Sequence, residues 1–256
     1  MIAQRSTWSG RLAFGPWWLL YSGPVRSMPP HAHQAFQIML HAGRPFVVDA
    51  DGQPMSGPLV VIDPDRKHAF RDRRDHVLIA YIEPASAIGE RLRNRHAHPV
   101  DHTESHPVQD IIGALRPDTW SRADEIVRKM VALVCELPSG VPMSLWRHPV
   151  IDAALHRLPA QVGEAAVDIH LLANEVGMSS EMLSQRFDVE VCMPLRSYVS
   201  WVRLVIAIEN LVVGASASAT AAVAGFGTEA QLALAFRSMF GMSAEEAVLL
   251  GSWLAP

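Results

Sequence analysis

Short apolar segments, each bounded by proline or glycine, occupy the first eighty residues of the chain. Many short segments at this spacing are typical of the strands of a β-sandwich or a small β-barrel. Asp51-Gly52, which lies between two of the segments, is a signal for a tight hairpin turn. The predicted strands cover residues 17–21, 36–40, 46–48, 59–62 and 77–82.

The hydrophobic period becomes helical near residue 83. Pro84 suits the first position of a helix that continues to about Arg95, and a second short helix is predicted for residues 108–115. The strongest helical period covers residues 121–137, where apolar positions recur every three or four residues opposite charged ones. This apolar stripe has two interpretations: it pairs with its twofold mate in a homodimer, or it packs on the strands of its own chain.

The clearest break in the chain is Pro138-Ser139-Gly140-Val141-Pro142, after which the pattern is helical and no hairpin signal remains. We therefore predict a strand-rich domain over residues 1–83 and connecting or dimerisation helices with a linker over residues 84–142. A helical domain is predicted over residues 143–256.

Membrane insertion and secretion are not expected from this sequence. The longest apolar run, residues 202–213, is interrupted by Arg203 and Glu209 and is shorter than the roughly 20 residues of a membrane helix. The N-terminus lacks the apolar segment of a secretory signal. The two cysteines are too few for a disulfide scaffold or a thiolate zinc site. We expect a cytoplasmic protein.

One pattern occurs twice in the helical part, with the two copies 48 residues apart. A small residue is followed four positions later by a glycine, as in Ala173 with Gly177 and Ala221 with Gly225. The small residue lets two helices approach closely, and the glycine provides the left-handed turn between them. A hydroxyl residue then opens a second helix with two apolar residues one turn apart. This combination predicts two helix-turn-helix units.

Residues 148–248 resemble the DNA-binding domain of AraC-type (arabinose-regulator-like) transcription regulators. The resemblance implies two helix-turn-helix units joined by a long helix at about residues 195–213, with reading helices that enter successive major grooves of DNA. Three positions depart from the family pattern: Cys192 replaces a usual glycine, Ala244 replaces a usual proline, and Ala247-Val248 replace a Tyr-Arg pair. The matching residues are Leu172-Ala173, Gly177-Met178-Ser179, Leu183, Phe187, Tyr198, Arg203-Leu204, Ala207, Leu211, Ala221, Gly225-Phe226, Phe236 and Phe240-Gly241.

The charge of this helical part is unusual for a DNA-binding domain. The whole chain has a net charge of −4, but residues 148–256 contain five basic and eleven acidic residues. Because phosphate neutralisation provides most non-specific affinity for DNA, we expect weak binding that depends on polar contacts. Gln185 and Gln231 could pair with adenine, Glu181 could accept from cytosine, and Arg186 and Arg237 could contact phosphates. The full set of candidate DNA-contacting residues is Ser180, Glu181, Ser184, Gln185, Arg186, Thr228, Gln231 and Arg237.

The order His31, His33, Gln37 and His68 resembles the two motifs of a cupin barrel, whose metal-binding members bring an His-x-His pair, a glutamate and a later histidine together. Alternate residues of a strand point the same way, so His31 and His33 could face one interior point. Gln37 stands where the carboxylate would be, and a neutral amide is a poor ligand for zinc or iron. Two interpretations therefore remain: a metal or effector site, or histidines that line or brace the barrel. A second histidine group at residues 96–106 is interpreted as a solvated loop.

Regulators of this type often have an effector-binding cupin in front of the DNA-binding domain, so the two resemblances agree. They imply an α+β two-domain protein: a cupin-like β-barrel over residues 1–83 that senses an effector, then an all-α domain over residues 143–256 with two helix-turn-helix units. The implied function is a transcription regulator that is not an enzyme and needs no cofactor. Its expected partners are double-stranded DNA, a small-molecule effector and a second copy of the chain, with RNA polymerase as a further candidate. The alternative is a cupin metalloenzyme of the dioxygenase or isomerase type, whose helical domain is structural or binds a protein partner.

Overall fold

The structure is a computed structural model in which the chain divides into two compact units, residues 1–143 and residues 144–248. The two units are described separately. The predicted linker at residues 138–142 and the loop residues 96–105 lie outside the described residues. The described residues are 10–94 (without 16, 26, 44 and 72), 106–114, 121–135, 148–162, 167–191, 193–241 and 243–244.

The first unit contains two antiparallel sheets. The larger sheet has the strand order β1-β2-β9-β4-β7, so that β9, the last strand in the chain, lies in its centre. Its strands are β1 (Arg11–Gly15), β2 (Trp18–Val25), β4 (Phe36–Leu40), β7 (Leu59–Ile62) and β9 (Arg74–Ile82). The smaller sheet has the order β3-β8-β5-β6, built from β3 (Met28–His31), β5 (Phe46–Ala50), β6 (Gln53–Gly57) and β8 (His68–Phe70).

All five predicted strands are present, and the predicted hairpin joins β5 to β6. Asp51 and Gly52 have φ values of 53° and 77°, as a two-residue hairpin turn with two left-handed positions requires. The apolar pattern did not predict β1, β3, β6 and β8. Strand β3 reads Met-Pro-Pro-His and β8 has only three residues, so neither shows the alternating apolar pattern on which the prediction relied.

The sheets do not form the single closed barrel that the sequence analysis expected; among the described strands they remain two separate sheets. Proline explains where the smaller sheet ends. Its edge strand β3 contains Pro29 and Pro30, and its other edge strand β6 contains Pro54. Proline has no N–H to donate to a further strand, so both edges resist extension of the hydrogen-bonded ladder.

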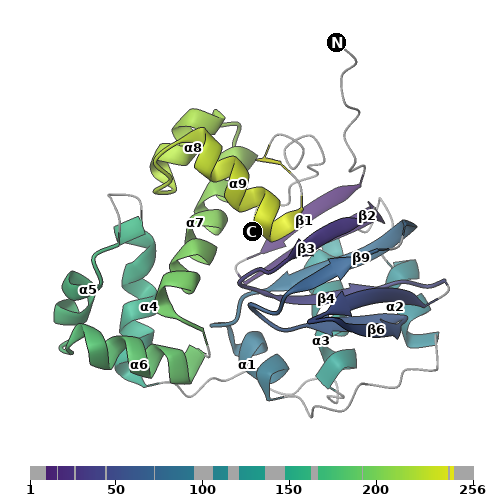
Figure 1. The fold of residues 1–256 in the computed structure, drawn as a ribbon, viewed down its shortest axis with the longest axis horizontal. Helices are drawn as coiled ribbons and strands as arrows, with labels where there is room; N and C mark the ends of the chain where they lie inside the picture. The colour runs from purple at the N-terminus through teal and green to yellow at the C-terminus, as the bar shows by residue number, and fades with distance from the viewer. Residues whose placement is uncertain are drawn as a thin grey trace. The chain divides into compact units, whose positions relative to one another are not determined.

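Three helices cover one face of the larger sheet: α1 (Ala87–Arg93), α2 (His106–Ala114) and α3 (Ala123–Cys135). Figure 1 shows α2 and α3 on the far side of the strands in this view. The apolar stripe of α3 is buried against sheet residues of its own chain, which decides between the two interpretations of that helix. The prediction that Pro84 begins α1 is wrong, because Ser86 caps this helix by accepting a hydrogen bond from the backbone N–H of Gly89.

The second unit is helical throughout its described residues (Figure 1). Its core is formed around the long helix α7, whose buried residues include Trp201, Leu204 and Leu211. No single described helix is long and apolar enough to cross a membrane; only α6 and α7 together, bent by 69°, pass on length and composition. The helices are α4 (Pro149–Val162), α5 (Ile169–Glu175), α6 (Ser180–Val191), α7 (Leu195–Val212), α8 (Ala217–Val223) and α9 (Glu229–Phe240).

Candidate nucleic-acid interface and histidine cluster

The first helix-turn-helix unit consists of α5, a turn at Gly177, and α6. Gly177 has a φ of 73°, and the backbone N–H of Met178 donates to the carbonyl of Ala173 at 2.9 Å. Ser179 caps the next helix, because its Oγ accepts from the backbone N–H of Met182 at 3.2 Å. Leu183 is fully buried, as predicted for the inner face of α6. The sequence pattern therefore produced the predicted turn.

The second helix-turn-helix unit consists of α8, a turn at Gly225, and α9, and it repeats this geometry. Gly225 has a φ of 72°, and the N–H of Phe226 donates to the carbonyl of Ala221 at 2.8 Å. Thr228 Oγ1 accepts from the N–H of Gln231 at 3.2 Å, while Gln231 Oε1 accepts from the N–H of Gly227 at 2.9 Å. The bond to Thr228 is the predicted N-cap of α9, whereas the Gln231 side chain accepts from the residue before the N-cap, so only the first half of the capping box is formed as predicted. The two units are thus equivalent in backbone structure.

Helix α7 joins the two helix-turn-helix units. Its 18 residues correspond to a length of about 27 Å. One turn of B-DNA is about 34 Å, so the length of this connecting helix is of the same order as the distance between successive major grooves.

On the reading helix α6, the candidate DNA-contacting residues differ in solvent exposure and in the contacts that their side chains already make. Glu181 and Gln185 are exposed, and Ser184 is half-buried. Ser180 Oγ lies 2.9 Å from His170 Nδ1, and Arg186 lies 3.6 Å from Glu190 of its own helix. An arginine in such an ion pair must give up part of it to contact a phosphate.

On α9, Gln231 and Thr228 are occupied with capping, as described above, and Arg237 is exposed in the last turn. Sequence analysis missed Leu234, which is 69% exposed on the outer face of this helix. The signal was available: from Leu183 to Leu232 the two copies are 49 residues apart, which aligns Leu234 with Gln185. The outer faces of α6 and α9 therefore differ in chemistry at equivalent positions.

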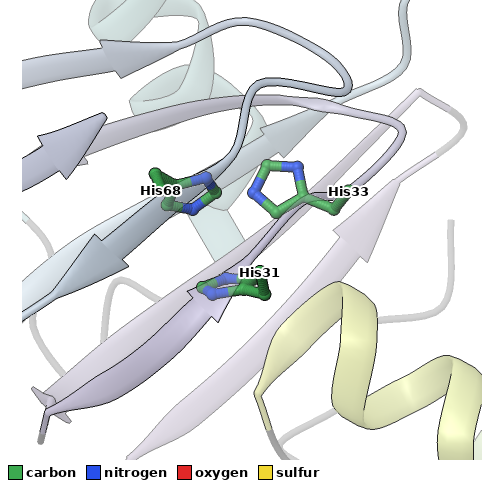
Figure 2. Close-up of side chains that lie close together, drawn as sticks. All are labelled: His31, His33 and His68. Atoms are coloured by element: carbon green, nitrogen blue, oxygen red, sulfur yellow. The ribbon is translucent and has the colours of Figure 1, made fainter. Parts of the chain in front are cut away.

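The second candidate site is a cluster of three histidines inside the first unit. His31 ends β3 and faces His68 of β8 in the strand register, and His33 lies in the segment between β3 and β4. The prediction that His31 and His33 share one strand is wrong, but the rings still converge. Ring centroids are 4.3 Å apart for His31 and His68, 4.8 Å for His33 and His68, and 5.9 Å for His31 and His33 (Figure 2).

Each ring is oriented by a hydrogen bond at Nδ1. The acceptors are the main-chain carbonyls of Pro29 for His31, of Ala35 for His33 and of Arg66 for His68, at 2.9, 3.1 and 2.9 Å. Since a carbonyl only accepts, Nδ1 carries the proton in all three rings and Nε2 has a free lone pair. Nε2 of His31 and of His68 is buried without a hydrogen-bond partner among the described residues.

Burial keeps these rings neutral. It lowers the pKa of His33 to about 3, with the neighbouring His68 and His31 lowering it further, and it lowers the pKa of His68 to about 4. The pKa of His31 is also lowered by burial. Neutral imidazoles with a free Nε2 are the form of histidine that binds a metal ion.

Gln37 and Tyr81 connect the cluster to the larger sheet. They are direct neighbours across β4 and β9, and Gln37 Nε2 lies 3.2 Å from the Tyr81 hydroxyl. Gln37 Oε1 lies 3.3 Å from His33 Nε2, which places two acceptor atoms side by side. Either the amide is rotated so that its NH₂ donates to His33, or a cation lies between the two atoms. Sequence analysis missed Tyr81, because only the strand register brings it next to Gln37.

The donor set fits a metal ion in three respects: ligand type, protonation and orientation. One nitrogen from each ring lies within 4.8 Å of those from the other two. A tetrahedral zinc site with bonds of 2.0–2.1 Å needs nitrogens about 3.4 Å apart, so the rings would have to move closer together. The carboxylate of the cupin pattern is missing, as Gln37 already indicated.

A known family model matches the helical part of the chain. Residues 172–248 match the family model described as a helix-turn-helix domain. No curated protein matches the sequence. The match confirms the helix-turn-helix prediction and the AraC-type resemblance for this part of the chain.

Two solved structures resemble the chain over both units. ToxT from Vibrio cholerae strain SCE256, bound to an unsaturated fatty acid, has a TM-score of 0.57 at 9% identity and covers 92% of this chain and 96% of its own. ToxT from Vibrio cholerae O395, bound to (E)-4-(8-methylnaphthalen-1-yl)but-3-enoic acid, has a TM-score of 0.57 at 8% identity, with coverages of 91% and 99%. At these identities the likeness establishes the two-domain fold alone. The predicted order, a sheet-rich domain followed by a helical one, is confirmed.

Proposed function

We propose that this protein is a DNA-binding transcription regulator whose N-terminal domain senses a small ligand. The observation that carries the proposal is the repeated unit in the second domain. Two glycines with nearly the same positive φ, followed by two capped helices, hold a pair of reading helices on one connecting helix. A duplicated geometry of this kind suits two half-sites on one face of DNA.

The two reading helices would recognise different base chemistry. On α6, the exposed Gln185 can donate to and accept from adenine in the major groove, and Glu181 can accept from cytosine. On α9, the equivalent position is Leu234, an apolar side chain suited to the methyl group of thymine. Gln231 would contribute little to base reading, because its side-chain oxygen already accepts from Gly227.

Affinity would depend only weakly on phosphate neutralisation. Residues 148–256 carry a net charge of −6, and Arg186 is within 3.6 Å of Glu190. We expect Arg237 and the N-terminal amides of α6 and α9 to contact the backbone, with Ser180 and Ser184 adding hydrogen bonds. Such a regulator would bind DNA tightly only at sites that also satisfy its base contacts.

The ligand-sensing role of the first domain is supported by the fold that it shares with ToxT, which has been crystallised with a fatty acid and with a naphthyl butenoic acid. In this chain, the buried histidine cluster is the feature best suited to receive a signal. Action in the cytoplasm, on chromosomal DNA, and contact with RNA polymerase are further parts of the proposal. A homodimer remains part of it too, although the apolar stripe of α3 is buried within its own unit and would not form the dimer contact.

Selection of genomic fragments by the purified full-length protein, followed by sequencing, tests the function. We expect enrichment of a bipartite sequence with half-sites about one helical turn apart. As a matched pair, Gln185→Ala should relax preference in one half-site and Leu234→Ala in the other. Recovery of no fragments at low salt, or of unselected fragments only, would contradict the proposal.

A further inference from the structure

We propose that His31, His33 and His68 bind one divalent transition-metal ion through their Nε2 atoms. The role of that ion as the sensed signal, or as part of the receptor for it, rests on the proposed function. Binding of the ion itself does not depend on that function.

The three rings are oriented as metal-binding histidines are. Three different backbone carbonyls, from Pro29, Ala35 and Arg66, hold the three Nδ1–H groups. Metal-binding histidines typically have this second hydrogen bond, which fixes the tautomer and leaves Nε2 for the ion. Figure 2 shows the rings of the three side chains gathered around one point.

The Nε2 atoms of the cluster lack hydrogen-bond donors among the described residues. Nε2 of His31 and Nε2 of His68 are buried and have no partner among the described residues, and burying an unpaired polar atom destabilises the folded state. The remaining Nε2, on His33, faces the acceptor oxygen of Gln37. One cation would satisfy these lone pairs together. The alternative is a water molecule that donates to His31 and His68, together with a rotated Gln37 amide that donates to His33.

The ligand chemistry restricts which ions suit the site. Imidazole nitrogens suit Zn²⁺, Ni²⁺, Co²⁺ and Cu²⁺, whereas Mg²⁺ and Ca²⁺ prefer oxygen ligands. The three rings are neutral, so the ion keeps its full charge in a buried site. His33 and His68 are 1% and 2% exposed, and Asp51, whose charge acts on His68, is itself paired with Arg66 at 2.9 Å. A further ligand, either Gln37 Oε1 or an anion from solution, would therefore strengthen binding.

The test is a Co²⁺ titration of full-length protein stripped with a chelator, followed by the visible absorption of the bound ion. Wild type should bind one equivalent. His33→Ala and His68→Ala should each weaken binding by at least about 100-fold, because loss of a direct ligand should exceed the 10–100-fold effect of losing an outer-shell partner. His41→Ala is the matched control: His41 lies outside the cluster and bonds to the carbonyl of His76, so its loss should leave binding unchanged.

Gln37→Glu provides a second test of the metal site if a histidine variant does not fold. A carboxylate at this position supplies the missing charge, so Co²⁺ should bind more tightly than to wild type. The proposal is overturned if wild type takes up no ion, if it binds as weakly as His33→Ala, or if His41→Ala alone removes binding. DNA binding is measured on the same samples with and without Co²⁺, so that loss of DNA binding in both would count against the regulator function and not against the metal site.

Discussion

The turn glycines Gly177 and Gly225 offer a matched pair of substitutions. Both have nearly the same left-handed backbone, with φ of 73° and 72°. Their surroundings differ. A Cβ on Gly177 would meet no atom within 4 Å, whereas a Cβ on Gly225 would press against the backbone carbonyl of Val162, at the end of α4.

The structure gives a magnitude for each alanine variant. An alanine in the left-handed region costs roughly 1–2 kcal/mol, and the loss of glycine's freedom in the unfolded chain returns about 0.4–1 kcal/mol. Gly177→Ala should therefore destabilise the protein by about 1 kcal/mol. At Gly225 the clash with a backbone atom adds about 1–3 kcal/mol, because a helix end cannot move aside as a flexible side chain can. Gly225→Ala should destabilise it by about 2–4 kcal/mol.

Urea unfolding of the full chain, followed by circular dichroism at a helical wavelength, measures both variants against wild type. The helical signal comes mainly from the second unit, which contains both glycines. Equal destabilisation by the two variants, or a smaller effect at Gly225, would refute the packing of α4 against the second turn. An unaffected Gly177→Ala protein would refute the left-handed turn between α5 and α6.

Three further predictions follow from the contacts described above. Metal-free protein should lose stability as the pH falls from about 6.5 toward 4. In the unfolded chain the two histidines then take up protons, whereas in the folded protein His33 and His68, with pKa values of about 3 and about 4, stay neutral. The free energy of unfolding should fall by about 1.4 kcal/mol per pH unit for each such proton, and urea unfolding that is unchanged between pH 7 and 5 would contradict the prediction. Thr228→Ala removes the cap of α9 and should cost about 0.5–2 kcal/mol in the same assay, with Thr228→Ser as a control that retains the cap and most of the stability. Replacing thymine by uracil in the half-site read by α9 should weaken binding to wild type by about 0.8 kcal/mol per contacted methyl group, but should not weaken binding to Leu234→Ala; equal responses of the two proteins would mean that Leu234 does not contact the bases. At the half-site read by α6, Gln185→Ala should weaken binding by about 1–3 kcal/mol.

Local sequence patterns predicted the parts of this fold that depend on neighbouring residues. The hairpin at Asp51-Gly52 and the turns at Gly177 and Gly225 need left-handed backbone, which few residues adopt, so their positions can be read directly. The cap that Thr228 provides for α9 follows from its spacing of three residues to Gln231. The side-chain oxygen of Gln231 accepts from the backbone N–H of Gly227, so the predicted base contact of Gln231 would be made by its amide NH₂ group.

Contacts between distant segments were not predictable in this way. Tyr81 reaches the histidine cluster only because β4 and β9 pair with Gln37 opposite Tyr81, a register that no local pattern contains. The apolar stripe of α3 has the same period whether it packs on its own sheet or on another chain, so the structure was needed to choose. Pro84 was assigned to a helix because proline fits a first turn, but the capping hydroxyl of Ser86 sets the actual start.

The affinity of the full-length protein for a selected genomic fragment, measured against a scrambled fragment over a range of salt concentrations, tests the central claim most directly. We predict that the selected fragment binds about 10³-fold or more tightly than the scrambled one. Because few cations are available, the logarithm of affinity should fall with the logarithm of salt at a slope of only about −2 to −4. Equal affinity for both fragments, or no binding to either at low salt, would mean that the helical domain has the structure of a DNA reader without its function.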